Sequence, residues 1–172
     1  MSEGPKSVPP ALAGGLIVDY RNRIKDLMDW TEIETSTHQD HVIKHVLGAT
    51  VLGWSVVGDA AHFLLDMGFL WTIYSDGEMN LLPQGVAISE LEGEQFTAAD
   101  RTAWASEADL LLQQGREVQG LTRFTAAPVE CLIASVALFV KEDRRMIMVQ
   151  GESADINIES LNANGQLTIS AA

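Results

Sequence analysis

Three of the four histidines of this 172-residue chain lie close together, at positions 38, 41 and 45. On a helix, His38, His41 and His45 share one face, and three imidazoles so placed can bind zinc and leave a fourth position open. On a strand only His41 and His45 would share a face, and the β-branched residues that follow favour a strand. The spacing therefore predicts a metal site only if this segment is helical. No sequence feature requires a cofactor. A divalent metal ion is the one cofactor that these histidines could bind.

Asp59, His62 and Asp66 are titratable residues inside the most apolar block of the chain. An Asp–His pair in apolar surroundings can have shifted pKa values and act as a catalytic acid and base. If residues 60–67 are helical, His62 and Asp66 lie one turn apart and can pair. The alternative is that Asp59 caps a turn and that His62 is an interior histidine with satisfied hydrogen bonds. Periodicity does not decide between helix and strand for this segment.

The remaining motifs favour a protein that is not an enzyme. Cys131 is the single cysteine, and its apolar neighbours predict a buried thiol rather than a nucleophile. Asp76, Glu78 and Asn80 are spaced like the start of a calcium loop, but Leu81 stands where that loop requires glycine. The glycines do not follow the spacing of a phosphate-binding loop.

Residues 45–100 contain no lysine or arginine, and their eight acidic residues carry most of the formal net charge of −13. Such a surface attracts cations and basic partners and repels anions. Glu90, Glu92 and Glu94 would line one side of an extended segment. We therefore expect a small ligand or a basic protein as partner, and no nucleic acid, because its phosphates would be repelled.

The apolar block at residues 46–74 is not expected to cross a membrane. Asp59, His62 and Asp66 interrupt it, and neither uncharged part reaches the roughly 20 residues that a membrane-spanning helix needs. The first residues lack the charged-then-apolar pattern of a signal peptide. Together with the single cysteine, this predicts a cytoplasmic protein.

Two helices are expected. An apolar stripe at helical spacing predicts one near residues 19–30. The second, near residues 97–114, begins at Thr97, whose hydroxyl can cap the helix with Asp100 near its positive end, and it ends at Gly115. The apolar stripe of the second helix consists of Trp104, Ala108, Leu111 and Leu112.

Several runs of apolar and β-branched residues predict strands. Residues 46–57, 131–140 and 146–150 are apolar at both parities, which is typical of strands buried on both faces. Residues 69–82 read as a hairpin with an Asp-Gly turn, and residues 156–169 alternate like a half-exposed hairpin.

These elements predict an α+β fold with a mainly antiparallel, curved sheet of about six to seven strands. Two helices cover about one face of such a sheet, so its other apolar face needs a second cover. Barrel- or sandwich-like closure would supply that cover, and so would a second copy in a two-fold dimer. We expect residues 1–9 to be a flexible tail and residues 10–172 to be a single domain.

Three functions are consistent with the sequence. The leading hypothesis is a non-catalytic ligand- or protein-binding domain that forms a homodimer through an apolar sheet face. One alternative is a metal-dependent enzyme that uses the cluster of His38, His41 and His45. The other is a cofactor-free enzyme with His62 and Asp66 as an acid–base pair.

Overall fold

The structure is a computed structural model that describes residues 27–58, 60–75, 79–81, 97–161 and 166–172. Residues 32–172 form one compact unit, to which the described residues 27–31 are not assigned. The predicted tail at residues 1–9 lies outside the described residues.

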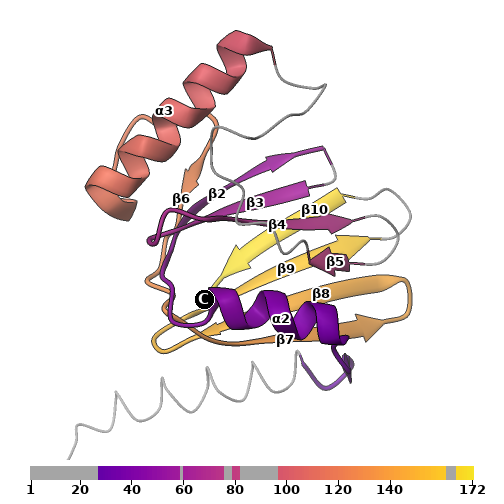
Figure 1. Ribbon diagram of the computed structural model, residues 1–172. Helices are drawn as coiled ribbons and strands as arrows, with labels where there is room; N and C mark the ends of the chain where they lie inside the picture. Colours follow the sequence, from indigo (N-terminus) through magenta and orange to yellow (C-terminus); the bar gives the residue numbers. More distant parts are fainter. Residues whose placement is uncertain (1–26, 59, 76–78, 82–96, 162–165) are drawn as a thin grey trace, which may run out of the picture. The chain divides into compact units, whose positions relative to one another are not determined.

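The first sheet holds the C-terminal part of the chain (Figure 1). Its strand order is β1-β7-β8-β9-β10, and the last four strands pair antiparallel as a meander. The C-terminal hairpin predicted near residues 156–169 is present as β9 and β10. The strands are β1 (Thr31–Ile33), β7 (Ile133–Lys141), β8 (Arg144–Gly151), β9 (Asp155–Leu161) and β10 (Gln166–Ala171).

The second sheet is antiparallel throughout, in the order β5-β4-β3-β2-β6. Residues 60–67, for which periodicity left helix and strand open, are mainly strand β3. Every residue of that strand is buried, which explains why no amphipathic pattern was visible. The strands are β2 (Val51–Val57), β3 (Ala60–Leu65), β4 (Leu70–Ser75), β5 (Met79–Leu81) and β6 (Thr125–Ala126).

The two sheets share one hydrophobic core. Leu138, Ile147 and Ile158 stand opposite one another across β7, β8 and β9 and belong to this core. On the second sheet an aromatic row contributes Trp54, Phe63 and Trp71, with ring centroids 5.8 and 6.0 Å apart. The sandwich-like closure considered from the sequence is therefore present, because each sheet buries an apolar face against the other.

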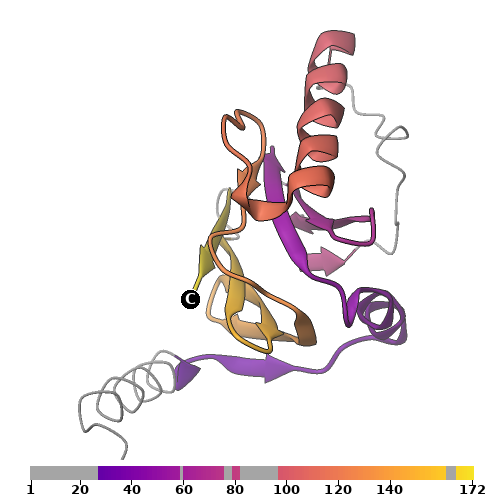
Figure 2. The same ribbon diagram turned by 90° about the vertical axis from the view of Figure 1, so that its left-hand side faces the viewer.

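Helix α3 (Ala98–Gln114) covers the other face of the second sheet (Figure 2). Trp104, Ala108 and Leu111 of the helix share a second core cluster with Leu64 and Leu70 of the sheet. The predicted stripe of this helix is thus confirmed, and so is its start at Thr97. A short 3-10 helix, η2 (Gly115–Glu117), follows it.

Helix α2 (Thr37–Val46) corrects the expectation that the sequence turns into strand before residue 46. The side chain of Ser36 accepts from the backbone of Gln39, whose side chain in turn binds the backbone of Ser36. This capping box starts the helix, and Val42 and Val46 fall on one face, where both are buried. Local capping and burial outweigh the β-propensity of the valines.

The helix predicted near residues 19–30 lies almost wholly outside the described residues. Leu27 is helical, and Met28 and Asp29 form a turn before β1. The predicted α+β class is confirmed, with two antiparallel sheets in place of one curved sheet. None of the helices in the described part of the chain has the length and hydropathy required to cross a bilayer.

Gly53 permits the close approach of β2, β6 and α3, and its replacement should destabilise the fold. A Cβ atom there would lie 2.5 Å from the carbonyl oxygen of Thr125 and 3.3 Å from a methyl group of Leu111. We expect Gly53→Ala to lower the free energy of unfolding by about 1–3 kcal/mol in urea denaturation. Val56→Thr, at an exposed position of the same strand, should change it by less than about 0.5 kcal/mol. Equal effects of the two variants would contradict this account.

Candidate functional site

A row of three polar side chains crosses the second sheet on the face that α3 covers. Ser55 on β2, His62 on β3 and Thr72 on β4 are directly opposite one another in the strand register. All three are buried, with His62 only 6% exposed. A buried polar row of this kind needs its hydrogen bonds satisfied within the protein.

The partners of this row come from the row itself and from the helix above it. His62 Nδ1 lies 2.9 Å from Thr72 Oγ1, and the indole nitrogen of Trp104 donates to Ser55 Oγ at 3.0 Å. The ring of Trp104 also meets the imidazole edge to face, with centroids 5.8 Å apart. These contacts attach α3 to the sheet.

Burial lowers the pKa of His62 below its usual value of 6.5, so the imidazole is neutral at neutral pH. A neutral imidazole beside a hydroxyl is the arrangement that activates a nucleophile in acyl-transfer enzymes. Here Thr72 is buried as well, and the imidazole beside it is covered by Trp104 of the helix. A structural role explains every contact of this row.

Asp66 does not join His62. Because residues 60–65 form a strand and not a helix, residues four apart are about 13 Å apart along the chain instead of one turn apart. The Asp66 carboxylate accepts from the backbone amide of Thr50 at 3.0 Å, and its own amide donates to the carbonyl of Thr50 at 2.9 Å. Asp59 lies outside the described residues. The proposed acid–base pair of His62 and Asp66 is therefore not assembled.

His62 should make the stability of the protein depend on pH near neutrality. The unfolded chain binds the proton more readily than the folded one, so stability is full above about pH 7 and falls as the pH drops below 6.5. The loss is at most about 1.4 kcal/mol per pH unit. Urea denaturation between about pH 7.5 and about pH 5.5 should show a steeper decline in stability for the native chain than for His62→Gln. Parallel declines would contradict this assignment.

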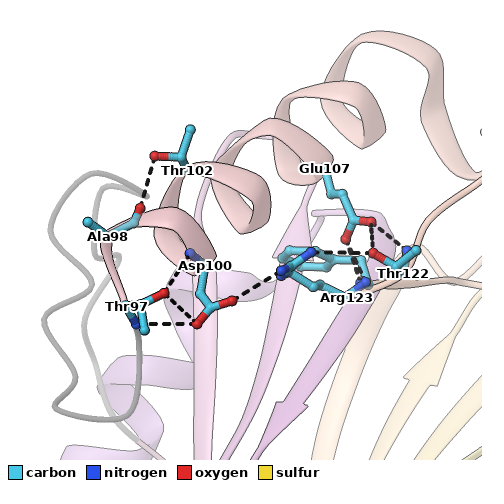
Figure 3. Close-up of polar contacts among 8 residues, drawn as sticks. Thr97, Ala98, Asp100, Thr102, Glu107, Thr122 and Arg123 are labelled. Carbon is cyan, nitrogen blue, oxygen red and sulfur yellow. Dashed lines mark hydrogen bonds and ion pairs between the residues drawn. The ribbon is translucent and has the colours of Figure 1, made fainter.

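Glu107 on α3 is a buried carboxylate that holds the segment after η2 (Figure 3). Its Oε1 accepts from the backbone amide and the hydroxyl of Thr122, and its Oε2 accepts from the amides of Arg123 and Phe124 at 2.7 and 3.1 Å. Burial alone would raise the pKa of Glu107, but these hydrogen bonds outweigh it and hold the pKa below 4.5.

The same segment is tied to the start of α3. Arg123 donates to Asp100 Oδ1 at 3.1 Å, while Asp100 Oδ2 accepts from the hydroxyl and amide of Thr97 (Figure 3). The hydrogen bonds from Thr97 and then from Arg123 lower the pKa of Asp100. Thr97, Asp100 and Arg123 thus form the helix cap and an anchor for the segment, with structural roles.

Replacing Glu107 by glutamine should destabilise the protein and remove part of its acid sensitivity. Glu107→Gln loses charge-assisted bonds and leaves backbone amides of residues 122–124 poorly paired, so we expect the free energy of unfolding to fall by about 1–3 kcal/mol at neutral pH. Because its folded-state pKa lies below 4.5, the contribution of Glu107 is full above that value and is lost as the pH falls through the folded-state pKa. Denaturation curves of both proteins should therefore converge in acid.

The matched control is Glu117→Gln, which removes one carboxylate from an exposed position next to the same helix. It should change the free energy of unfolding by less than about 0.5 kcal/mol. Equal losses in the two variants would show that Glu107 acts only through the net charge.

The three clustered histidines lie on helix α2, where all three side chains are exposed. Nε2 of His41 lies 3.3 Å from Nε2 of His45, and their rings meet edge to face. His38 stands one turn earlier on the helix. Across the described residues, no three His, Cys, Asp or Glu side chains are placed to hold a metal ion together.

The other sequence candidates have structural roles or lie outside the described residues. Cys131 is buried in the shared core, and burial, followed by the nearby carboxylate of Asp155, raises its pKa to about 11. Its thiol is therefore no nucleophile at neutral pH. Asp76, Glu78, Glu90, Glu92 and Glu94 lie outside the described residues, and Asn80 is part of β5.

A cavity of about 340 Å³ lies between the β1 segment and β7. One side is formed by Glu32 and Glu34, which are exposed, and the other by three apolar residues of β7. We call it the acidic cavity. Its lining residues are Glu32, Ile33, Glu34, Thr35, Val136, Ala137 and Leu138.

Sequence reasoning did not identify this cavity or the role of Glu107. The lining of the cavity comes from two segments about a hundred residues apart in the chain, and no local motif indicates that they meet. Glu107 carried a weak signal, since it interrupts the side of α3 that also holds Trp104, Ala108 and Leu111.

The chain matches no family model, no curated protein and no solved structure.

Proposed function

We propose that this protein is a non-catalytic binding domain that takes a positively charged group of its ligand into the acidic cavity. The observation that carries the proposal is the pair of carboxylates, Glu32 and Glu34, beside an apolar wall formed by Val136, Ala137 and Leu138. The net charge of −13 adds a long-range attraction for cations.

Within the part of the chain that the structure describes, the carboxylates of the acidic cavity have no basic partner. None of its lining residues is basic. Among the residues that the structure describes, no basic side chain is paired with Glu32 or Glu34. Uncompensated carboxylates repel each other, and a bound cation would relieve that repulsion.

The shape and lining of the cavity fit a lysine or arginine side chain. Its volume falls within the range of about 300–1,000 Å³ typical of ligand sites. The apolar residues of β7 can pack against the methylene stem of such a side chain, while Glu32 and Glu34 accept from its charged head.

The sheet edge beside the cavity favours an extended peptide as the ligand. Of the described strands only β1, three residues long, lies next to that edge of β7, which is nine residues long. An edge with unpaired backbone groups can accept an added strand, and alternate side chains of that strand then reach pockets. A basic segment of a partner protein would satisfy both the edge and the cavity.

The interior polar groups support a binding role over a catalytic one. His62 is hydrogen-bonded to Thr72 under α3, and the exposed Asp66 is hydrogen-bonded to the backbone of Thr50. Glu107 is fully engaged with the segment that it holds. A substrate would have to displace α3 to reach the buried imidazole.

Self-association through an apolar sheet face stays a prediction. We expected self-association because one apolar sheet face would lack a cover. In the structure the two sheets cover each other, and α3 covers the outer face of the second sheet. Large apolar side chains that remain exposed in residues 32–172, within the described part, are Ile33, Leu47, Val56, Met67 and Phe69.

Binding of a lysine-rich peptide tests the proposal directly. The probe is a fluorescently labelled peptide of about ten residues in extended form, titrated with the full chain and followed by fluorescence anisotropy. Replacing both Glu32 and Glu34 by glutamine should weaken binding about tenfold, because the charge-assisted bonds from the peptide are replaced by weaker neutral ones. The same peptide with glutamate in place of lysine should not bind.

A control double variant with the same change in net charge distinguishes the effect of the cavity carboxylates from the effect of the overall charge of the protein. Glu130→Gln and Glu152→Gln together remove two exposed carboxylates that are not part of the cavity lining. This control should retain most of the affinity. If it weakens binding as much as the cavity variant, the peptide senses only the net charge and the proposed site is wrong.

A further inference from the structure

His41 and His45 are a pair of imidazoles held one turn apart on the exposed side of α2. Their Nε2 atoms are 3.3 Å apart, and the ring centroids are 4.7 Å apart with the planes nearly perpendicular. The opposite side of the helix is fixed, since Val42 and Val46 are buried in the shared core. The pair therefore stands on a rigid element, as a preformed ligand set requires.

We propose that His41 and His45 chelate a divalent transition-metal ion through their Nε2 atoms. Imidazole nitrogen suits Zn²⁺, Cu²⁺ and Ni²⁺. Two nitrogens bound to a tetrahedral zinc at about 2.0–2.1 Å stand about 3.3–3.4 Å apart. The observed separation of 3.3 Å is therefore already that of two zinc ligands.

This site uses two protein ligands, with water in the remaining positions. His38 lies on the same helix, but no group of three ligating side chains forms among the described residues. Asp40 is not available either, because its Oδ1 accepts from the hydroxyl of Thr35. The proposal does not rest on the acidic cavity, since it involves other residues and another element.

The orientation of the pair favours binding over a purely structural role. Both rings are exposed, and their mutual contact requires one Nε2 to donate and the other to accept. A metal ion would instead bind the lone pairs of both nitrogens. Little side-chain freedom remains to be lost on binding, because the two rings already lie close together.

Zinc titration by calorimetry tests the proposal, on the full chain purified without a histidine tag. The native chain should bind one Zn²⁺. His41→Ala and His45→Ala should each weaken binding at least about tenfold, because each removes a direct ligand. His38→Ala is the matched control and should change the affinity by less than about twofold.

Circular dichroism checks that the variants fold, which we expect because the substituted positions are exposed and alanine is a strong helix former. Two outcomes would overturn the proposal. One is a double variant, His41→Ala with His45→Ala, that binds zinc as tightly as the native chain. The other is a His38→Ala variant that loses as much affinity as His41→Ala, which would indicate three ligands and not two.

Discussion

The structure depends on one constraint, which is that strands apolar on both faces must be covered on both. Strand β3 illustrates it, since Phe63 belongs to the core between the sheets while Leu64 belongs to the cluster under α3. The meander of β7 to β10 covers one face of the second sheet, and α3 covers the other. Burial of this apolar surface is the main favourable term in folding, at roughly 25 cal/mol per Å². The polar row of Ser55, His62 and Thr72 is tolerated because Trp104 and the row itself satisfy its hydrogen bonds.

Helix α3 and the C-terminal meander could be predicted from the sequence because their signals are local. Thr97 and Asp100 cap the helix within one turn, and alternation in β9 and β10 reports which face is buried. The secondary structure of residues 60–65 and 42–46 could not be predicted, and each segment has its own physical reason. The first segment is buried on all sides, so it has no periodicity, and in the second a capping box at Ser36 outweighs β-branched side chains. That two sheets form, and not one curved sheet, follows from long-range packing that no single segment encodes.

The candidate sites divide in the same way. The spacing of the histidines on α2 was visible in the sequence, and the helix that the pattern needed is present, although the geometry selects His41 and His45 as a pair. The pairing of His62 with Asp66 depended on a helix that is absent. The acidic cavity unites Glu32 and Glu34 with β7 through tertiary structure alone, so only the general acidity of the chain pointed toward it.

The hydrogen bonds of Glu107 affect the chain-entropy cost of assembling the second sheet. The strands from β7 to β10 pair with their neighbours in sequence, so each step closes a short loop. Strand β6 pairs with β2, which lies much earlier in the sequence, and α3 lies between the two strands along the chain. Closing this longer loop costs more chain entropy. By binding Thr122, Arg123 and Phe124, Glu107 links α3 to the residues just before β6. The helix and the edge strand are therefore linked directly, and we expect this link to shorten the effective loop that closes when β6 pairs with β2.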